Sequence, residues 1–136
     1  MKKVILIFFI VLTSCSEISD QIFENIEEKR EEKTSPHVDY LFYNSTEYNF
    51  NAAYIHMYGE VIDLGYFPSK SYSPVYSNYY ILNSAEAVMY YKEKKFSYVL
   101  PSLVTPDTIR DDGIYVYKIS IDNLSKRTLK VDLSKL

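Results

Sequence analysis

The chain has 136 residues, a formal net charge of −3, one cysteine and no tryptophan. This length is enough for one domain with a hydrophobic core of its own, but short for two. A single cysteine cannot form an internal disulfide, so the fold has to depend on that core. An acidic chain lacks the positive charge that attracts nucleic acids, and we expect no nucleic-acid partner.

Residues 1–15 have the layout of an export signal. Two lysines follow the first methionine, and residues 4–12 form an unbroken apolar run. These nine residues would span about 13 Å as a helix, far less than the roughly 30 Å of a bilayer core. The pattern therefore predicts a secretory signal peptide over residues 1–14 and not a permanent transmembrane helix.

The residues Leu12-Thr13-Ser14-Cys15 resemble the lipobox of bacterial lipoprotein precursors. The resemblance implies cleavage after Ser14 and a lipid on Cys15 that anchors the protein to a membrane of the cell envelope. Ser16 follows, where an aspartate is typical of lipoproteins that stay in the inner membrane. In a diderm bacterium we therefore expect the outer membrane, with the domain facing the periplasm or the surface.

Residues 15–35 are predicted to be the lipidated N-terminus and a charged tether. Between residues 16 and 33 the chain has seven acids and three bases, with a narrow apolar stripe formed by Ile18, Ile22 and Ile26. Such a stripe on a charged segment indicates a helical or flexible spacer. Proline at position 36 ends it, and residues 36–136 are predicted to form a single globular domain.

The first half of this domain reads mainly as strands. Residues 38–43 are rich in strand formers and predict a first strand. Residues 51–67 fit either a helix or a hairpin with its turn at Gly59-Glu60, and propensity favours the hairpin. Residues 68–77 predict a loop, and residues 79–82 a short buried strand.

One clear helix is predicted over residues 83–95. Asn83 and Glu86 have the spacing of a capping box, and residues 85–95 contain neither glycine nor proline. Lysines near the end of this segment suit the negative C-terminal end of a helix. They are Lys92, Lys94 and Lys95.

The last part of the chain predicts more strands. Residues 96–100 read as a strand, and residues 101–112 as a polar loop. Residues 113–121 and 129–133 alternate between apolar and polar side chains and predict a hairpin. The expected fold is therefore an α+β domain with a small, predominantly antiparallel sheet.

No catalytic motif stands out in the sequence. The two histidines, His37 and His56, are not accompanied by a nucleophile elbow, and there is no metal-binding motif or phosphate loop. We therefore expect no cofactor and no metal. All fifteen tyrosines lie between Tyr40 and Tyr117, which fits either ordinary strand formation or a recognition surface.

The order of four segments looks like that of ADP-ribosyltransferase-like domains. The segments are residues 40–43, 62–69, 79–87 and 115–119. The resemblance implies a helix within residues 51–64 and a nicotinamide pocket for NAD lined by Tyr80 and Ser84. Residues 38–45 lack the basic residue of that family, and the globular part lacks its Glu-x-Glu motif.

The sequence favours a lipid-anchored cell-envelope protein whose domain binds without chemistry of its own. Its expected partner is another protein or a surface polymer. The alternatives are an ADP-ribosyltransferase-like transferase that uses NAD, and a structural lipoprotein of the envelope.

Overall fold

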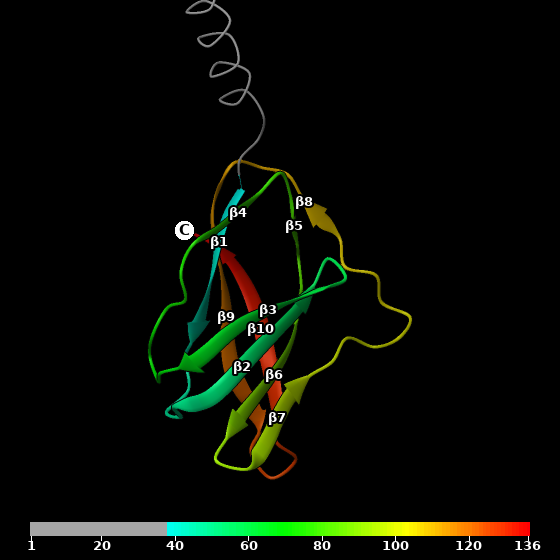
Figure 1. The fold of residues 1–136 in the computed structure, drawn as a ribbon. Helices are drawn as coiled ribbons and strands as arrows, with labels where there is room; N and C mark the ends of the chain where they lie inside the picture. Colours follow the sequence, from blue (N-terminus) through cyan, green and yellow to red (C-terminus); the bar gives the residue numbers. More distant parts are fainter. Residues whose placement is uncertain (1–37) are drawn as a thin grey trace, which may run out of the picture. The chain divides into compact units, whose positions relative to one another are not determined.

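The computed structural model describes residues 38–136, and every regular element in this range is a β-strand (Figure 1). The strands are β1 (Val38–Asn44), β2 (Phe50–Met57), β3 (Glu60–Phe67), β4 (Tyr76–Asn78), β5 (Ile81–Leu82), β6 (Glu86–Tyr91), β7 (Lys94–Tyr98), β8 (Thr108–Ile109), β9 (Gly113–Asn123) and β10 (Thr128–Lys135). Eight strands form one sheet in the order β3-β2-β6-β7-β10-β9-β1-β4, and β5 pairs with β8. The predicted signal peptide, Cys15 and the tether lie outside the described residues.

The predicted α+β class is wrong for residues 38–136, which form an all-β domain. No helix in this range is long and apolar enough to cross a membrane. The segment 83–95, predicted as a helix, contains β6, a turn and the start of β7. Here Ala87 and Met89 are buried, but Val88 between them is apolar too, so the period of two that marks a strand is hidden.

The residues that imitate a capping box make tertiary contacts instead. The Asp107 amide donates a hydrogen bond to Asn83 Oδ1 at 3.0 Å, which ties the segments that carry β5 and β8. The Leu100 amide donates to Glu86 Oε1 at 2.9 Å. Both side chains therefore satisfy backbone groups that are distant in the sequence, a use that local spacing cannot reveal.

Both predicted hairpins form. Residues 51–67 contain the antiparallel pair β2–β3, as propensity favoured, but the turn lies one residue earlier than expected, at Tyr58-Gly59. These two residues have φ of 58° and 72°, the positive values that a type I′ hairpin turn requires. The antiparallel pair β9–β10 confirms the second hairpin, and Leu129 is buried in it as the alternation predicted.

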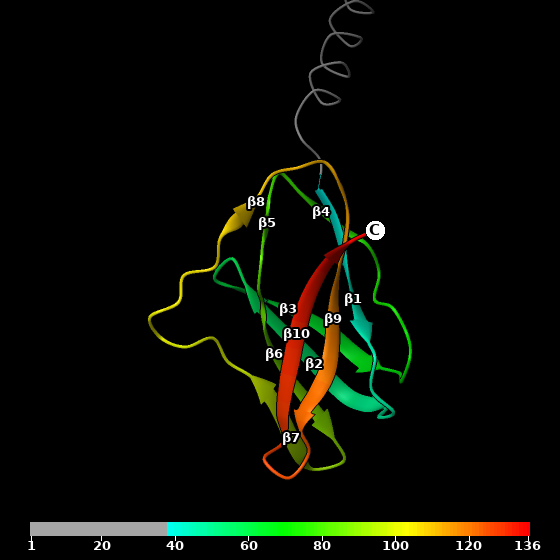
Figure 2. The same cartoon turned by 180° about the vertical axis from the view of Figure 1, so that it is seen from behind.

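The eight-stranded sheet curls into a half-barrel and buries its inner face (Figure 2). Strands β1 and β9 run parallel, with Phe42 opposite Tyr117. The rings of these two residues stack at 5.3 Å between centroids, and Tyr40 stacks on Tyr76 at 5.6 Å. Such ring pairs contribute about 0.5–1.5 kcal/mol each beyond the area they bury.

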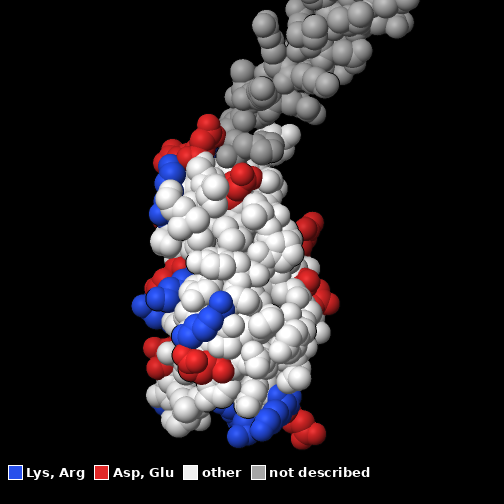
Figure 3. Space-filling model, turned by 90° about the vertical axis from the view of Figure 1, so that its left-hand side faces the viewer, with Lys and Arg blue, Asp and Glu red and all other residues white. Residues whose placement is uncertain are grey.

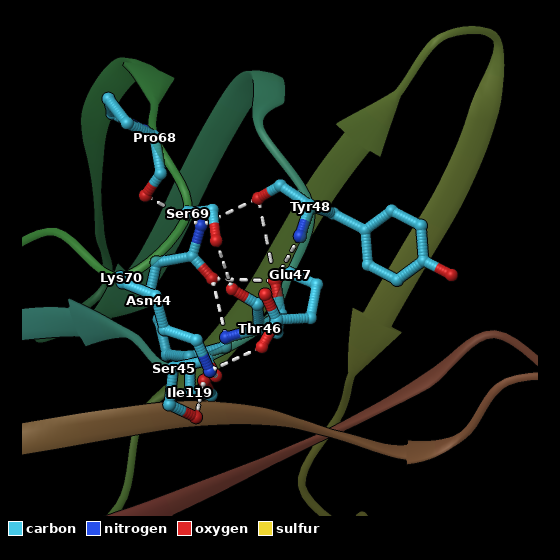
Figure 4. A network of polar contacts seen from close by, with 9 residues as sticks. All are labelled: Asn44, Ser45, Thr46, Glu47, Tyr48, Pro68, Ser69, Lys70 and Ile119. Carbon is cyan, nitrogen blue, oxygen red and sulfur yellow. Dashed lines mark hydrogen bonds and ion pairs between the residues drawn. The ribbon is translucent and has the colours of Figure 1, made fainter.

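One end of the half-barrel is closed by the side chain of Asn44, which is fully buried at the end of β1 (Figure 4). Its Nδ2 donates to the carbonyls of Phe67 at 3.1 Å and Pro68 at 2.9 Å, where β3 ends. The chain then returns along β1, with the Asn44 amide bonded to the Ser71 carbonyl and the Ser73 amide to the Phe42 carbonyl, both at 2.9 Å. These bonds join the end of β3, one edge strand of the sheet, to β1, which lies next to the other edge strand β4.

The other end is covered by the segment around β5. Ile81 is fully buried, as predicted, whereas Tyr79 is exposed. The Tyr117 hydroxyl donates to the Leu82 carbonyl, and the Tyr58 hydroxyl donates to the Tyr80 carbonyl at 3.0 Å. Two tyrosines therefore hold this segment over the core through their hydroxyl groups.

These contacts predict that alkali destabilises the domain. Burial raises the pKa of Tyr40, Tyr58, Tyr76 and Tyr117. Above about pH 10 these groups ionise in the unfolded chain but stay protonated in the folded one, so the free energy of unfolding falls as pH rises. We expect urea unfolding to show this fall above about pH 10, and Tyr117→Phe to make it less steep.

At neutral pH the same substitution should cost about 1–3 kcal/mol, because the Leu82 carbonyl loses its donor. Tyr66, which is exposed on β3, provides the matched control. Equal alkaline slopes for Tyr117→Phe, Tyr66→Phe and the unsubstituted protein would contradict the prediction.

Candidate functional site: an aromatic hollow between two basic turns

Two turns lie side by side at one end of the domain, the β6–β7 turn at residues 92–93 and the β9–β10 turn at residues 124–127 (Figures 1 and 2). The Ser97 amide donates to the Arg127 carbonyl at 3.1 Å and holds them together. An open hollow of about 570 Å³ lies beside them. We name it the tyrosine hollow, and it is lined by Tyr48, Tyr91, Lys94, Phe96, Leu124, Ser125 and Arg127. Its volume is in the usual range of ligand sites.

Aromatic rings form one wall of the tyrosine hollow. The rings of Tyr48 and Tyr91 meet edge to face at 4.8 Å between centroids, and Tyr48 lies 5.9 Å from Phe96. Phe96 is buried and packs on the buried ring of Phe50 at 5.9 Å. This wall is therefore an outward extension of the core, and its rings are fixed by packing.

Tyr48 owes its position to the buried Asn44 network. The Tyr48 carbonyl accepts from Asn44 Nδ2 at 2.9 Å, and its amide donates to Thr46 Oγ1 at 3.1 Å. The Thr46 hydroxyl in turn donates to Asn44 Oδ1 at 2.7 Å. Figure 4 shows the Tyr48 ring directed away from this network while its backbone is held in it. The network that closes the half-barrel thus also presents a ring to the hollow.

The two basic turns are held without glycine. Lys92 and Arg127 have φ of 54° and 55°, which is uncommon for residues with side chains. Side chains compensate for this conformation: the Lys92 amide donates to Asn51 Oδ1, and the Lys126 amide to Asn123 Oδ1, both at 2.9 Å. The cationic side chains therefore project from a fixed backbone.

Positive charge is concentrated at this end of the domain. Residues 38–136 contain ten lysines and arginines, and half of them are Lys92, Lys94, Lys95, Lys126 and Arg127. With Glu93 and Asp122 the local net charge is +3. The ion pairs within residues 38–136 are Lys70–Glu47 and Lys130–Asp132, so these five cations remain outside them. Figure 3 shows one group of Lys and Arg at the lower end of the molecule, and others higher on its left side.

The residues that the family resemblance singled out lie elsewhere. Tyr80 is half-buried before β5, and the guanidinium of Arg110 lies 5.9 Å from its ring centroid. Ser84 lines a separate hollow of about 340 Å³, together with His56 and Glu86 but not Tyr80. The resemblance implied a helix within residues 51–64, but this segment belongs to the hairpin β2–β3.

Sequence reasoning missed the tyrosine hollow because its lining comes from three separate parts of the chain. The sequence predicts Lys94 near the end of a helix, and Tyr48 lies between the predicted elements at residues 38–43 and 51–67. One signal was present: basic clusters occur at residues 92–95 and 126–127, and the second lies next to an alternating apolar pattern. That signal predicts two basic hairpin turns only if residues 83–95 are interpreted as strands and not as a helix.

No protein-family model matches the chain, and no curated protein or solved structure matches it either. Within residues 38–136 no group of three or more histidine or acidic side chains is placed to hold a metal ion. The geometry of the tyrosine hollow is therefore the basis for a functional proposal.

Proposed function

We propose that the protein is a lipid-anchored protein of the bacterial cell envelope whose β-domain binds a surface polymer in the tyrosine hollow. The lipobox-like residues Leu12-Thr13-Ser14-Cys15 support the anchor. The observation that carries the binding role is the fixed pair of rings, Tyr48 and Tyr91, which meet at 4.8 Å on one wall of the hollow.

The form of the hollow favours a polymer as the ligand. It is open, and residues of both turns line it, so a chain of sugar rings can pass across it. The faces of aromatic rings carry partial negative charge and attract the C–H groups of a sugar face. Tyrosine also offers a hydroxyl group to the sugar hydroxyls, which suits it to recognition surfaces.

A protein partner is the second candidate, and one observation favours it. The loop at residues 99–106 contains no charged residue, and its Leu103 side chain is 97% exposed. Val99 and Val104 in the same loop are also exposed. Exposed apolar side chains that lie together are typical of protein interaction sites.

The anchor predicts a change in mass and in membrane attachment. Cys15→Ser removes the sulfur that would carry the lipid, so this variant should remain an uncleaved precursor without acyl mass. The unsubstituted protein, extracted from membranes, should begin at Cys15 and carry added acyl mass, which intact-mass spectrometry measures. An unmodified protein that begins at Met1 would contradict the proposed anchor.

The binding role predicts that the two rings contribute to affinity for envelope polysaccharide. Tyr91→Ala should weaken co-sedimentation with deproteinised cell-wall polysaccharide by about 10-fold, which corresponds to about 1.4 kcal/mol. Tyr66→Ala removes an exposed tyrosine on β3 and serves as the control. If both variants bind as the unsubstituted protein does, or if none of the three proteins sediments with the polymer, the proposed site is wrong.

A further inference from the structure

We infer that the ligand of the tyrosine hollow is a polyanionic glycan, with its sugar faces on Tyr48 and Tyr91 and its carboxylate or phosphate groups on Lys94 and Arg127. This inference rests on the proposed function and specifies the chemistry of the ligand. Aromatic rings and cationic side chains line the same hollow.

The first support is the distribution of charge along the strands. Residues 38–136 carry ten bases and eleven acids, yet the end with the two turns has a net charge of +3. The opposite half of the domain has a net charge of −4. It holds the start of β1, the β2–β3 turn, the start of β6, the residues around β8 and the end of β10, and therefore contains Asp39, Glu60, Glu86, Asp107, Asp111 and Asp112, with Arg110 and Lys135. A domain polarised in this way steers an anionic polymer to the turns and repels it elsewhere.

The second support is the state of the two cations that line the hollow. Neither Lys94 nor Arg127 belongs to an ion pair within residues 38–136. The planar guanidinium of arginine can pair with a carboxylate or phosphate through two parallel hydrogen bonds, whereas the lysine ammonium acts as a compact point charge. Because the hollow is open, an anion can meet both cations without the full cost of burying them.

The third support is that a ring and a cation lie next to each other in the lining of the hollow. Tyr91 precedes the β6–β7 turn and Lys94 follows it, and their backbones are paired across the two strands. A polyanionic glycan likewise presents a sugar face and a charged group in every repeating unit. The surface of a bilayer is flat, whereas these rings line a hollow that a polymer chain can enter.

Affinity electrophoresis with soluble polymers tests the inference. The full-length protein, extracted in an uncharged detergent, is run through native gels that contain alginate, a polyuronate, or dextran, its neutral counterpart. We expect alginate to retard the protein at least 10-fold more strongly than dextran, and added NaCl to reduce the retardation because salt screens exposed charges.

Two double variants distinguish the effect of the cations in the hollow from the effect of the net charge of the protein. Lys94→Gln with Arg127→Gln should weaken alginate binding by about 10-fold or more, since it removes both anion contacts. Lys118→Gln with Lys130→Gln removes the same charge from exposed positions on β9 and β10 and should leave binding nearly unchanged. Circular dichroism confirms that each variant is folded.

The outcomes distinguish this inference from the proposed function. Equal retardation by alginate and dextran, or equal losses in the two double variants, would overturn the polyanion inference. If the protein sediments with cell-wall polysaccharide through Tyr91 but alginate does not retard it, the inference is likewise wrong and the binding role stands. If the protein binds neither alginate nor cell-wall polysaccharide, both proposals fail.

Discussion

The buried carboxamide of Asn44 is the contact on which both the fold and the candidate site depend. An unpaired buried amide costs several kcal/mol, so a fully buried asparagine is tolerated only when its partners are in place. From the end of β1, its nitrogen and oxygen together reach the end of β3 and the loop between β1 and β2. The side chain therefore fixes the curl of the sheet through groups far apart in the sequence.

The same constraint closes one end of the half-barrel and presents a tyrosine ring at that end. Where Asn44 satisfies the backbone, the loop at residues 45–49 is short and fixed, and Tyr48 projects from it toward β6 and β7. Beyond it, β9 and β10 continue to a basic turn that has no equivalent on β1. The hollow thus arises because β1 ends earlier than the neighbouring strand β9. Rings that extend from the core line the space that this difference leaves.

The sequence predicted elements well where alternation and turn residues agree, as in β1 and the two hairpins β2–β3 and β9–β10. It failed over residues 83–95, because both faces of β6 are apolar and its turn uses Lys92, a residue that carries no turn signal. The tyrosine hollow could not be predicted for a related reason. Its rings and cations become neighbours only through the pairing of β6 with β7 and of β7 with β10.

Amide hydrogen exchange in Asn44→Ala tests the central claim most directly, with Asn49→Ala, which removes a single exposed contact, as the control. We predict that the amides of Tyr48 and Ser73 lose protection by more than the global loss of stability, whereas amides in the middle of β9 follow the global loss. Asn49→Ala should leave all of these amides protected. A uniform change across the domain, or no change at Tyr48 and Ser73, would contradict the role assigned to Asn44.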